Sequence, residues 1–244
     1  MFNTLYSVKR KRHISPVSMV ESPRRRRPRR PLLTREAVVE AGARVLERAG
    51  YAGLTMRAIA DELGVQAPAL YWYVGGKDEL EALLYDHLMA GFFVTLAGDD
   101  WRDNLRQAAQ QLRRHLRSKR DISQIIPQQL SLGPNSSAQL DGALAILRGA
   151  GLSPPDAAYA FNMLFGYVVD WAAGEAAWAE RLAHAPETTS PGPPPDPGRY
   201  PFLAEANAYL VRDDIDGRFE FGLECMIGGL EQRIAQRPAG AASS

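Results

Sequence analysis

Apolar residues near the start of the chain recur every three or four positions, which is the spacing of amphipathic helices. The first such segment follows Thr34, a good N-cap residue, and stops at Gly50, a residue type that often ends helices. A second segment starts at Leu54–Thr55 and ends at Gly64. Two helices separated by a short connection are therefore predicted in this region.

Two further helices are predicted directly after Gly64. A short one begins near Gln66–Ala67–Pro68, because a proline in the first turn loses no helical hydrogen bond. Gly75–Gly76 then interrupts the chain, and a longer helix is expected from Lys77 to about Ala97. The segment from 54 to 77 thus has the form helix, glycine turn, helix.

Every long segment after Trp101 also has helical periodicity. Helices are expected over 101–119, 121–129, 136–150, 154–182, 202–210 and 215–236. Seven prolines fall within 185–201, which is therefore expected to be a loop. No stretch alternates with a period of two, so the predicted fold is all-α, with a three-helix helix-turn-helix domain followed by a larger helical domain.

Charge divides the chain unevenly. Residues 1–33 carry ten Lys and Arg and one acid, a net charge of +9, whereas the remainder has a net charge of −8. The expected organisation is a disordered basic arm (1–33), a DNA-binding domain (34–80), a regulatory domain (81–237) and a disordered tail (238–244). The arm, including Arg24, Arg25, Arg26 and Arg27, is expected to touch nucleic acid. The alternatives are a solvated tail, or a start assigned upstream of the true one.

Composition excludes several classes of protein. Hydrophobic residues make up 45% and charged residues 23%, no run of 18 apolar residues exists, and the single cysteine, Cys225, cannot form an intrachain disulfide. The four histidines are scattered, and no Ser-His-acid order, metalloprotease motif or glycine-rich phosphate loop occurs. We expect a cytoplasmic protein without membrane contact, catalytic site, metal or cofactor.

The outer face of the short helix is unusually aromatic. It presents Tyr71, Trp72 and Tyr73, which suit contacts with sugar, phosphate or a thymine methyl group in a major groove. One or two of these rings could instead fill the small core of the domain. The residues expected to touch DNA are Thr34, Thr55, Arg57, Gln66, Ala67, Pro68, Ala69, Tyr71, Trp72, Tyr73 and Lys77.

These residues carry a family resemblance. The patterns AG-x-x-GLT, R-x-IA-x-x-LGV and P-x-LYWYV-x-x-K, in order between Ala49 and Lys77, resemble the DNA-binding domain of the tetracycline repressor (TetR) family. The segments WRDNLRQAAQQLRRHLRSKRD, GALAILRGAGLSPPDAAYAFNMLFGYVVDWAAGE and FEFGLECMIGGLEQRI resemble the regulatory domain of the tetracycline repressor branch. The resemblance implies a dimeric repressor that leaves a palindromic DNA operator when a small molecule binds.

The resemblance also implies roles for single residues. Thr55 and Arg57 match positions that touch phosphate or a base edge, and Lys77 matches a phosphate contact. Ala67 and Ala69 replace a polar glutamine and threonine of the tetracycline repressor, so a different operator is expected.

The ligand site implied by the resemblance is changed in this chain. Phe93, Ala108, Ile126 (or Pro127) and Tyr167 replace polar residues that hold a magnesium–drug chelate, while Glu175 is retained. We expect a hydrophobic or aromatic effector bound without metal, or one anchored by Gln128, Gln129, Asn162 and Tyr167. The predicted ligand-binding residues are Phe93, Ala108, Leu112, Leu116, Ile126, Gln129, Phe161, Asn162, Phe165, Tyr167, Trp171 and Glu175.

A last stripe of apolar residues predicts the dimer interface. In the family, the counterparts of 154–182 and of the final helix form a four-helix bundle across a two-fold axis, and glycines at 222, 228 and 229 would permit close approach. The interface residues expected are Phe165, Trp171, Phe219, Leu223, Met226, Ile227 and Leu230. Packing within the protomer's own core is the alternative, and both can hold. An activator, a ligand-independent DNA binder or a helical enzyme are the rival functions.

Overall fold

The computed structural model describes residues 33–92, 94, 96, 98–126, 133–184, 194–210 and 214–236, with the side chains of 180–184 excepted. All of its elements in this part of the chain are helices, as predicted. The predicted arm, most of the proline-rich loop and the predicted tail lie outside the described residues, as do Arg24 to Arg27, Phe93, Pro127, Gln128 and Gln129.

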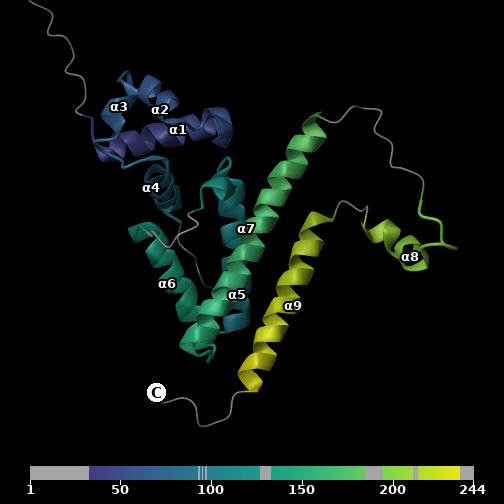
Figure 1. Ribbon diagram of the computed structural model, residues 1–244. Helices are drawn as coiled ribbons and strands as arrows, with labels where there is room; N and C mark the ends of the chain where they lie inside the picture. The colour runs from purple at the N-terminus through teal and green to yellow at the C-terminus, as the bar shows by residue number, and fades with distance from the viewer. Residues whose placement is uncertain are drawn as a thin grey trace, which may run out of the picture. The chain divides into compact units, whose positions relative to one another are not determined.

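The first four helices lie together in Figure 1 and bury a common set of apolar side chains. They are α1 (Arg35–Gly53), α2 (Met56–Leu63), α3 (Ala67–Leu70) and α4 (Lys77–Met89). Helix α1 packs against both α2 and α4, and α2 packs against α3. The core side chains that they bury include Val38, Val45, Leu46, Ile59, Leu70, Leu80 and Leu84.

Local chemistry sets the ends of these helices. The hydroxyls of Thr34 and Thr55 accept the backbone N–H of Ala37 and Ala58, both at 3.1 Å, and so cap α1 and α2. Gly50 has φ 69°, which breaks α1 at the predicted place although helical turns resume to Gly53. Helix α4 ends earlier than predicted, at Met89, because the backbone leaves the helical region at Ala90 and Gly91 adopts φ 75°.

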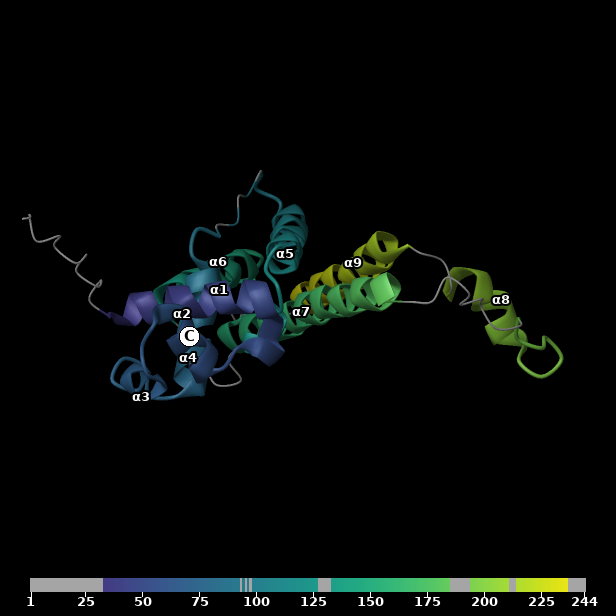
Figure 2. The same cartoon turned by 90° about the horizontal axis from the view of Figure 1, so that it is seen from above.

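The remaining helices are α5 (Trp101–Arg117), a 3₁₀ turn η1 (Ile122–Ile125), α6 (Pro134–Gly149), α7 (Pro154–His184), α8 (Pro201–Leu210) and α9 (Ile215–Ala235). Helix α7 packs against α5, α6 and α9, and α4 packs against α6. Figure 2 shows α7 and α9 running next to each other. The helix predicted over 121–129 is only the single 3₁₀ turn within the described residues.

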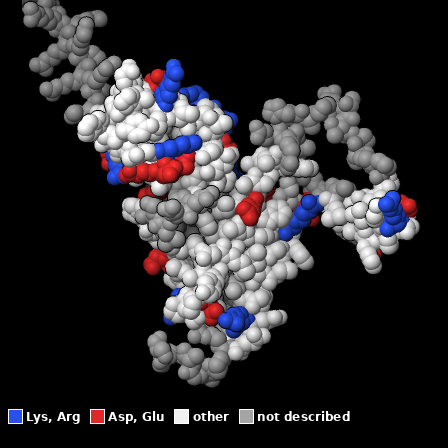
Figure 3. All heavy atoms as spheres, in the orientation of Figure 1, with Lys and Arg blue, Asp and Glu red and all other residues white. Residues whose placement is uncertain are grey.

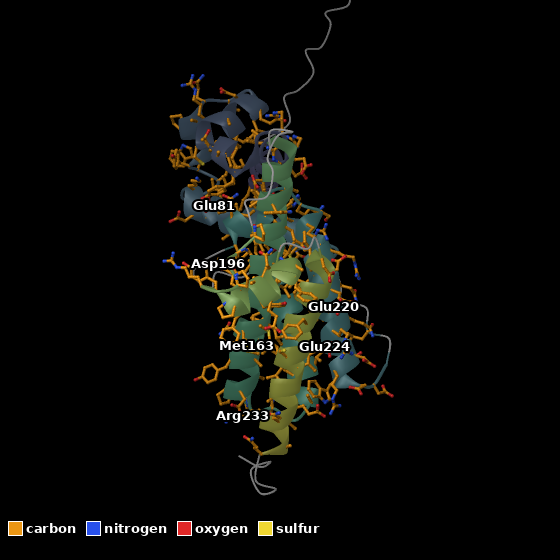
Figure 4. The ribbon with its side chains drawn as sticks, turned by 90° about the vertical axis from the view of Figure 1, so that its right-hand side faces the viewer. Glu81, Met163, Asp196, Glu220, Glu224 and Arg233 are labelled. Atoms are coloured by element: carbon orange, nitrogen blue, oxygen red, sulfur yellow. The ribbon has the colours of Figure 1, made fainter. Side chains whose placement is uncertain are left out.

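A row of polar contacts joins α5 to α9. Arg106 makes two hydrogen bonds to Glu224, at 2.6 and 2.9 Å, and Gln110 donates to Glu220 at 2.7 Å. Glu220 and Glu224 lie one turn apart on α9 (Figure 4). At the end of this row the buried Arg113 pairs with Glu175 of α7 and with Asp216 of α9. These contacts fix α5, α7 and α9 as one frame.

Candidate functional site

The segment α2–Gly64–α3 has the geometry of a helix-turn-helix. Gly64 adopts the left-handed conformation (φ 65°, ψ 34°), which a glycine reaches without strain. The N–H of Val65 then bonds to the carbonyl of Ala60 at 2.9 Å, which closes the end of α2. The turn therefore directs α3 away from α2, with Leu70 buried beneath it.

Most of the predicted DNA-contacting residues in the described part of the chain are exposed. They are Thr34, Thr55, Arg57, Gln66, Pro68, Tyr71, Trp72 and Lys77. Trp72 is 89% exposed and Tyr71 is 55% exposed, although neither ring is stabilised by such exposure. Ala67, Ala69 and Tyr73 are partly buried, and Ala67 and Tyr73 pack against the core. One of the three aromatic residues thus faces inward, and two face solvent.

Several basic side chains of this region are engaged by acids. Arg44 and Arg48 both pair with Glu62 at 2.9 Å, and Arg35 pairs with Glu79. On the face shown in Figure 3, blue and red side chains of α1–α4 lie close together, so that face is not uniformly basic. Arg57, by contrast, is exposed and has no ion-pair partner among the residues described.

Lys77 stands at the start of α4. Its ammonium lies 4.6 Å from the centre of the Tyr51 ring and 3.5 Å from a carboxylate oxygen of Glu81. These contacts hold an exposed cation beside the first turn of a helix, where a phosphate group is favoured.

A cavity of about 250 Å³ lies among α4, α5, α6 and α7. Its described lining consists of Tyr85, Met89, Phe92, Val94, Leu105, Ala108, Ala109, Leu112, Ile126, Ser136, Gln139, Leu140, Ala143, Leu147, Phe161, Asn162, Leu164, Phe165 and Val168. None of these side chains is an acid, a base or a histidine. The rings of Phe161 and Phe165 stack with their centres 5.3 Å apart. This lining suits an uncharged molecule with a flat apolar body.

Six of the predicted ligand-binding residues line this cavity: Ala108, Leu112, Ile126, Phe161, Asn162 and Phe165. Leu116, Tyr167, Trp171 and Glu175 are not in its lining. Leu116 is buried in the core. The hydroxyl of Tyr167 donates to the carbonyl of Phe219 at 2.8 Å, and Trp171 packs edge-on against the Phe219 ring.

Glu175 does not line the cavity in this structure; it forms ion pairs that hold α7 against α5. It is 8% exposed and pairs with Arg113 and, at 3.1 Å, with Arg117 of α5. The resemblance to a family position could not reveal this contact, because it depends on two arginines of another helix.

Apart from Phe93, which was predicted in the helix from Lys77 to about Ala97 and lies outside the described residues, sequence reasoning missed the residues that α4 and α6 contribute to the cavity. Tyr85, Met89 and Phe92 of the α4 segment follow the spacing i, i+4, i+7, and this regular stripe was the available signal. Ser136, Gln139 and Ala143 of α6 share a second stripe of the same kind. The cavity is therefore walled partly by the helix that begins at the end of the helix-turn-helix.

A buried carboxylate ties α4 to α6. Asp86 is 8% exposed, and one of its oxygens accepts both the backbone N–H and the hydroxyl of Ser136, each at 2.8 Å. Its other oxygen accepts the Asn135 amide at 3.0 Å. A carboxylate that receives N–H donors at the start of a helix is well stabilised. The two helices are thus locked together beside the cavity.

The predicted dimer-interface residues lie mostly inside the protomer. Phe219, Leu223, Ile227 and Leu230 are at most 8% exposed, while Met226 and Trp171 are partly buried and Phe165 lines the cavity. Gly222 is needed within the protomer, because a Cβ there would collide with the Tyr167 hydroxyl. The exposed large hydrophobic side chains of these helices, within the described residues, are instead Tyr159, Met163 and Trp178 of α7 and Phe221 of α9.

No helix in the described part of the chain is long and apolar enough to span a membrane. Among the same residues, no group of three or more His, Cys, Asp and Glu side chains is placed to hold a metal ion.

Comparisons with known proteins agree with this geometry. Residues 38–83 match the family "Bacterial regulatory proteins, tetR family", and residues 95–234 match "Tetracyclin repressor-like, C-terminal domain". The chain is 34% identical over 207 residues to the class C tetracycline repressor protein of Escherichia coli, covering 82% of this chain and 91% of the relative. It is 33% identical over 226 residues to the HTH-type transcriptional repressor DrrR1 of Streptomyces coeruleorubidus, covering 87% and 83%.

Solved structures show the same arrangement. ActR of Streptomyces coelicolor in complex with actinorhodin has a TM-score of 0.71 and 27% identity, covering 84% of this chain and 99% of ActR. A TetR variant of Acinetobacter baumannii in complex with minocycline has a TM-score of 0.60 and 26% identity, covering 82% and 98%. The fold and the exposed recognition helix define a helix-turn-helix regulator of transcription. The chain belongs to the TetR family.

His115, which packs near the end of α4, is expected to make the stability of the fold depend on pH. Its ring Nε2 donates to the carbonyl of Leu88 at 2.9 Å, near the end of α4, and its ring lies 4.7 Å from that of Phe92. Burial lowers the pKa of His115 below its ordinary value, and the charge of Lys119 adds to this, against the opposing effect of the bond to Leu88.

A histidine with a lowered pKa takes up its proton more readily in the unfolded chain. The contribution of neutral His115 to the free energy of unfolding is therefore fully present above pH 6.5. This contribution should decline as the pH falls below that value. We expect the melting temperature to fall between pH 7.5 and pH 5.5, and His115→Gln to reduce that fall. His87→Gln, at an exposed position of α4, is the matched control and should behave as wild type. An unchanged pH profile in His115→Gln would contradict this assignment.

Proposed function

We propose that this chain is a homodimeric repressor that binds a palindromic operator and leaves it when an uncharged, aromatic small molecule enters the cavity. The observation that carries the proposal is the double role of α4. Leu80 and Leu84 belong to the core of the helix-turn-helix, and Tyr85 and Met89, on the same helix, line the cavity. The proposal assigns no catalysis to the chain, and places it in the cytoplasm with the DNA.

The proposed mechanism is a shift of population. A molecule that needs room beside Met89 and Phe92 displaces α4, and the helix-turn-helix moves with it because Leu80 and Leu84 are anchored there. The spacing of the two recognition helices in a dimer, about 34 Å for adjacent major grooves, is then lost. Emptying an operator almost completely requires the ligand to favour the released state by about 5.5 kcal/mol.

The chemistry of the cavity limits the effector. Its described lining has no charged side chain, so desolvation of a charged ligand would not be compensated. The same residues offer no carboxylate or imidazole for a magnesium chelate, and they do not fit one. The relatives ActR and TetR have been solved with actinorhodin and minocycline, respectively, both named as ligands in those structures. We propose a compact aromatic effector held without metal.

The dimer is proposed to form through the outer faces of α7 and α9. Tyr159, Met163 and Phe221 are 71%, 42% and 73% exposed, which is costly for a protomer that remains alone. The surface over these two helices is mostly uncharged in Figure 3. The predicted residues Phe219, Leu223 and Ile227 would support this interface from beneath.

Operator recognition is assigned to α3 and its flanks. Tyr71 and Trp72 offer rings to the sugar–phosphate backbone or to thymine methyl groups, and Arg57 offers a guanidinium to phosphate or guanine. Thr34, Thr55, Gln66 and Lys77 are proposed to fix the register on phosphates, with Ala67, Pro68 and Ala69 giving apolar contacts and Tyr73 supporting them.

Trp72→Ala tests this surface. Because the ring is 89% exposed, we expect the melting temperature to stay unchanged while affinity for the DNA upstream of the gene falls about tenfold. A gel-shift titration measures the affinity. Phe202→Ala, which removes an 84% exposed ring from α8, is the matched control and should bind as wild type. Equal affinity of the two variants would refute the assignment.

Deletion of residues 1–31 tests the proposed role of the basic arm. Residues 34–80 carry five basic and seven acidic residues, so the arm would supply most of the positive charge near the phosphates. We expect weaker binding and a shallower slope of log affinity against log salt concentration. Deleting residues 238–244 is the control. An unchanged slope after removal of the arm would show that the arm is only solvated.

A further inference from the structure

Tyr85 is a buried tyrosine in the wall of the cavity. The residue is 5% exposed and lines the cavity, and its hydroxyl makes no hydrogen bond to any residue that the structure describes. Its oxygen is not among the enclosed side-chain atoms that lack a partner, so it remains accessible to a water-sized molecule. A phenylalanine would fill the same apolar space, so the accessible hydroxyl points to a role in binding.

Another tyrosine, Tyr167 of α7, has a hydrogen-bond partner for its hydroxyl within the protein. The hydroxyl of Tyr167 donates to the carbonyl of Phe219 at 2.8 Å, while its ring stacks on Phe219. Tyr167 thus behaves as a structural residue. Tyr85 also lines an apolar space, but no described carbonyl oxygen accepts its hydroxyl.

The other donors of the cavity wall near α4 are already engaged. The Ser136 hydroxyl donates to Asp86 at 2.8 Å, and the Gln139 amide donates to the carbonyl of Phe92. Asn162 is exposed. Tyr85 is therefore the buried side chain of the described lining whose donor is available to a molecule inside the cavity.

We propose that Tyr85 is the hydrogen-bonding anchor of the effector, donating its hydroxyl to a neutral oxygen of an aromatic ligand, such as a phenol or a carbonyl group. This inference rests on the proposed function of the cavity and narrows its ligand class. The recognised molecule carries an oxygen on a flat apolar body, and a pure hydrocarbon of the same size binds less well.

The electrostatics near Tyr85 support a neutral partner. Burial, together with the charge of the neighbouring Asp86, raises the pKa of Tyr85 to about 12, so the hydroxyl keeps its proton at neutral pH. The same carboxylate disfavours an anionic group at this position. Tyr85 can therefore donate to an uncharged oxygen without any change of protonation.

The position of Tyr85 also links binding of the effector to the proposed movement of α4. It lies on α4, directly before the Asp86 that holds Asn135 and Ser136 at the start of α6. A ligand bound to Tyr85 thus contacts the moving helix itself, at the point where this helix is attached to its neighbour.

The test uses the full chain and two probes of nearly equal shape, 2-naphthol and 2-methylnaphthalene, with binding measured by isothermal titration calorimetry. Wild type should bind 2-naphthol more tightly than the hydrocarbon. Tyr85→Phe should lower the affinity for 2-naphthol about tenfold. It should change the affinity for 2-methylnaphthalene by less than about twofold. Tyr209→Phe, which removes the hydroxyl of a 71% exposed tyrosine of α8, is the matched control.

The outcomes separate this inference from the proposed function. If Tyr85→Phe binds both probes as wild type does, the anchor is wrong, although the cavity remains a ligand site. If neither probe binds to wild type, the anchor and the cavity's role as an aromatic site are both refuted. Tyr85→Phe should keep the wild-type melting temperature, because it removes a hydroxyl that makes no hydrogen bond to the described residues. A large drop would mean that the hydroxyl is structural and would overturn the inference.

Discussion

Helix α4 contributes buried side chains to two places at once, and the account of regulation depends on that constraint. Leu80 and Leu84 are held in the core with α1 and α2, and Tyr85 and Met89 close one side of the cavity. Since the helix has only 13 residues, neither group can move far without the other. A second attachment reinforces the link: Arg120 donates to the carbonyls of Glu47 and Arg48, and Asp121 accepts the N–H of Tyr51.

In the regulatory half, α5, α7 and α9 form a rigid frame, and α4 is expected to move relative to this frame. Arg113 is buried among Glu175, Asp216 and the ring of Phe219, and removing one partner would leave an uncompensated charge. The contacts of Arg106 and Gln110 with α9 extend the same frame along its length. Helix α6, by comparison, is attached to α4 through Asp86 and packs against α7. Ligand-dependent motion is therefore expected at α4 and α6 rather than at α5, α7 and α9.

Periodicity in the sequence predicted the helix-turn-helix and the other helices, except over 121–129, where the described residues form a single 3₁₀ turn. The threonine caps and Gly64 are local features, so their effects could be predicted without knowledge of tertiary contacts. The end of α4 was misjudged because the apolar residues continue past Met89 while the backbone turns at Gly91. The roles of Tyr167 and Glu175 depend on partners more than 50 residues away, which no local pattern specifies. For the same reason, the cavity wall could be assigned only in part.

Occupying the cavity without a ligand tests the central claim most directly. Ala143 of α6 lines the cavity, and Ala145 of the same helix is exposed. Affinity for the upstream DNA should be measured by gel shift for Ala143→Phe and, as the matched control, Ala145→Phe, with both variants confirmed as folded dimers. The account predicts that the filled cavity weakens DNA binding by at least about tenfold, equivalent to 1.4 kcal/mol, while the control binds as wild type. A folded Ala143→Phe dimer with wild-type affinity would contradict control of the helix-turn-helix by the cavity.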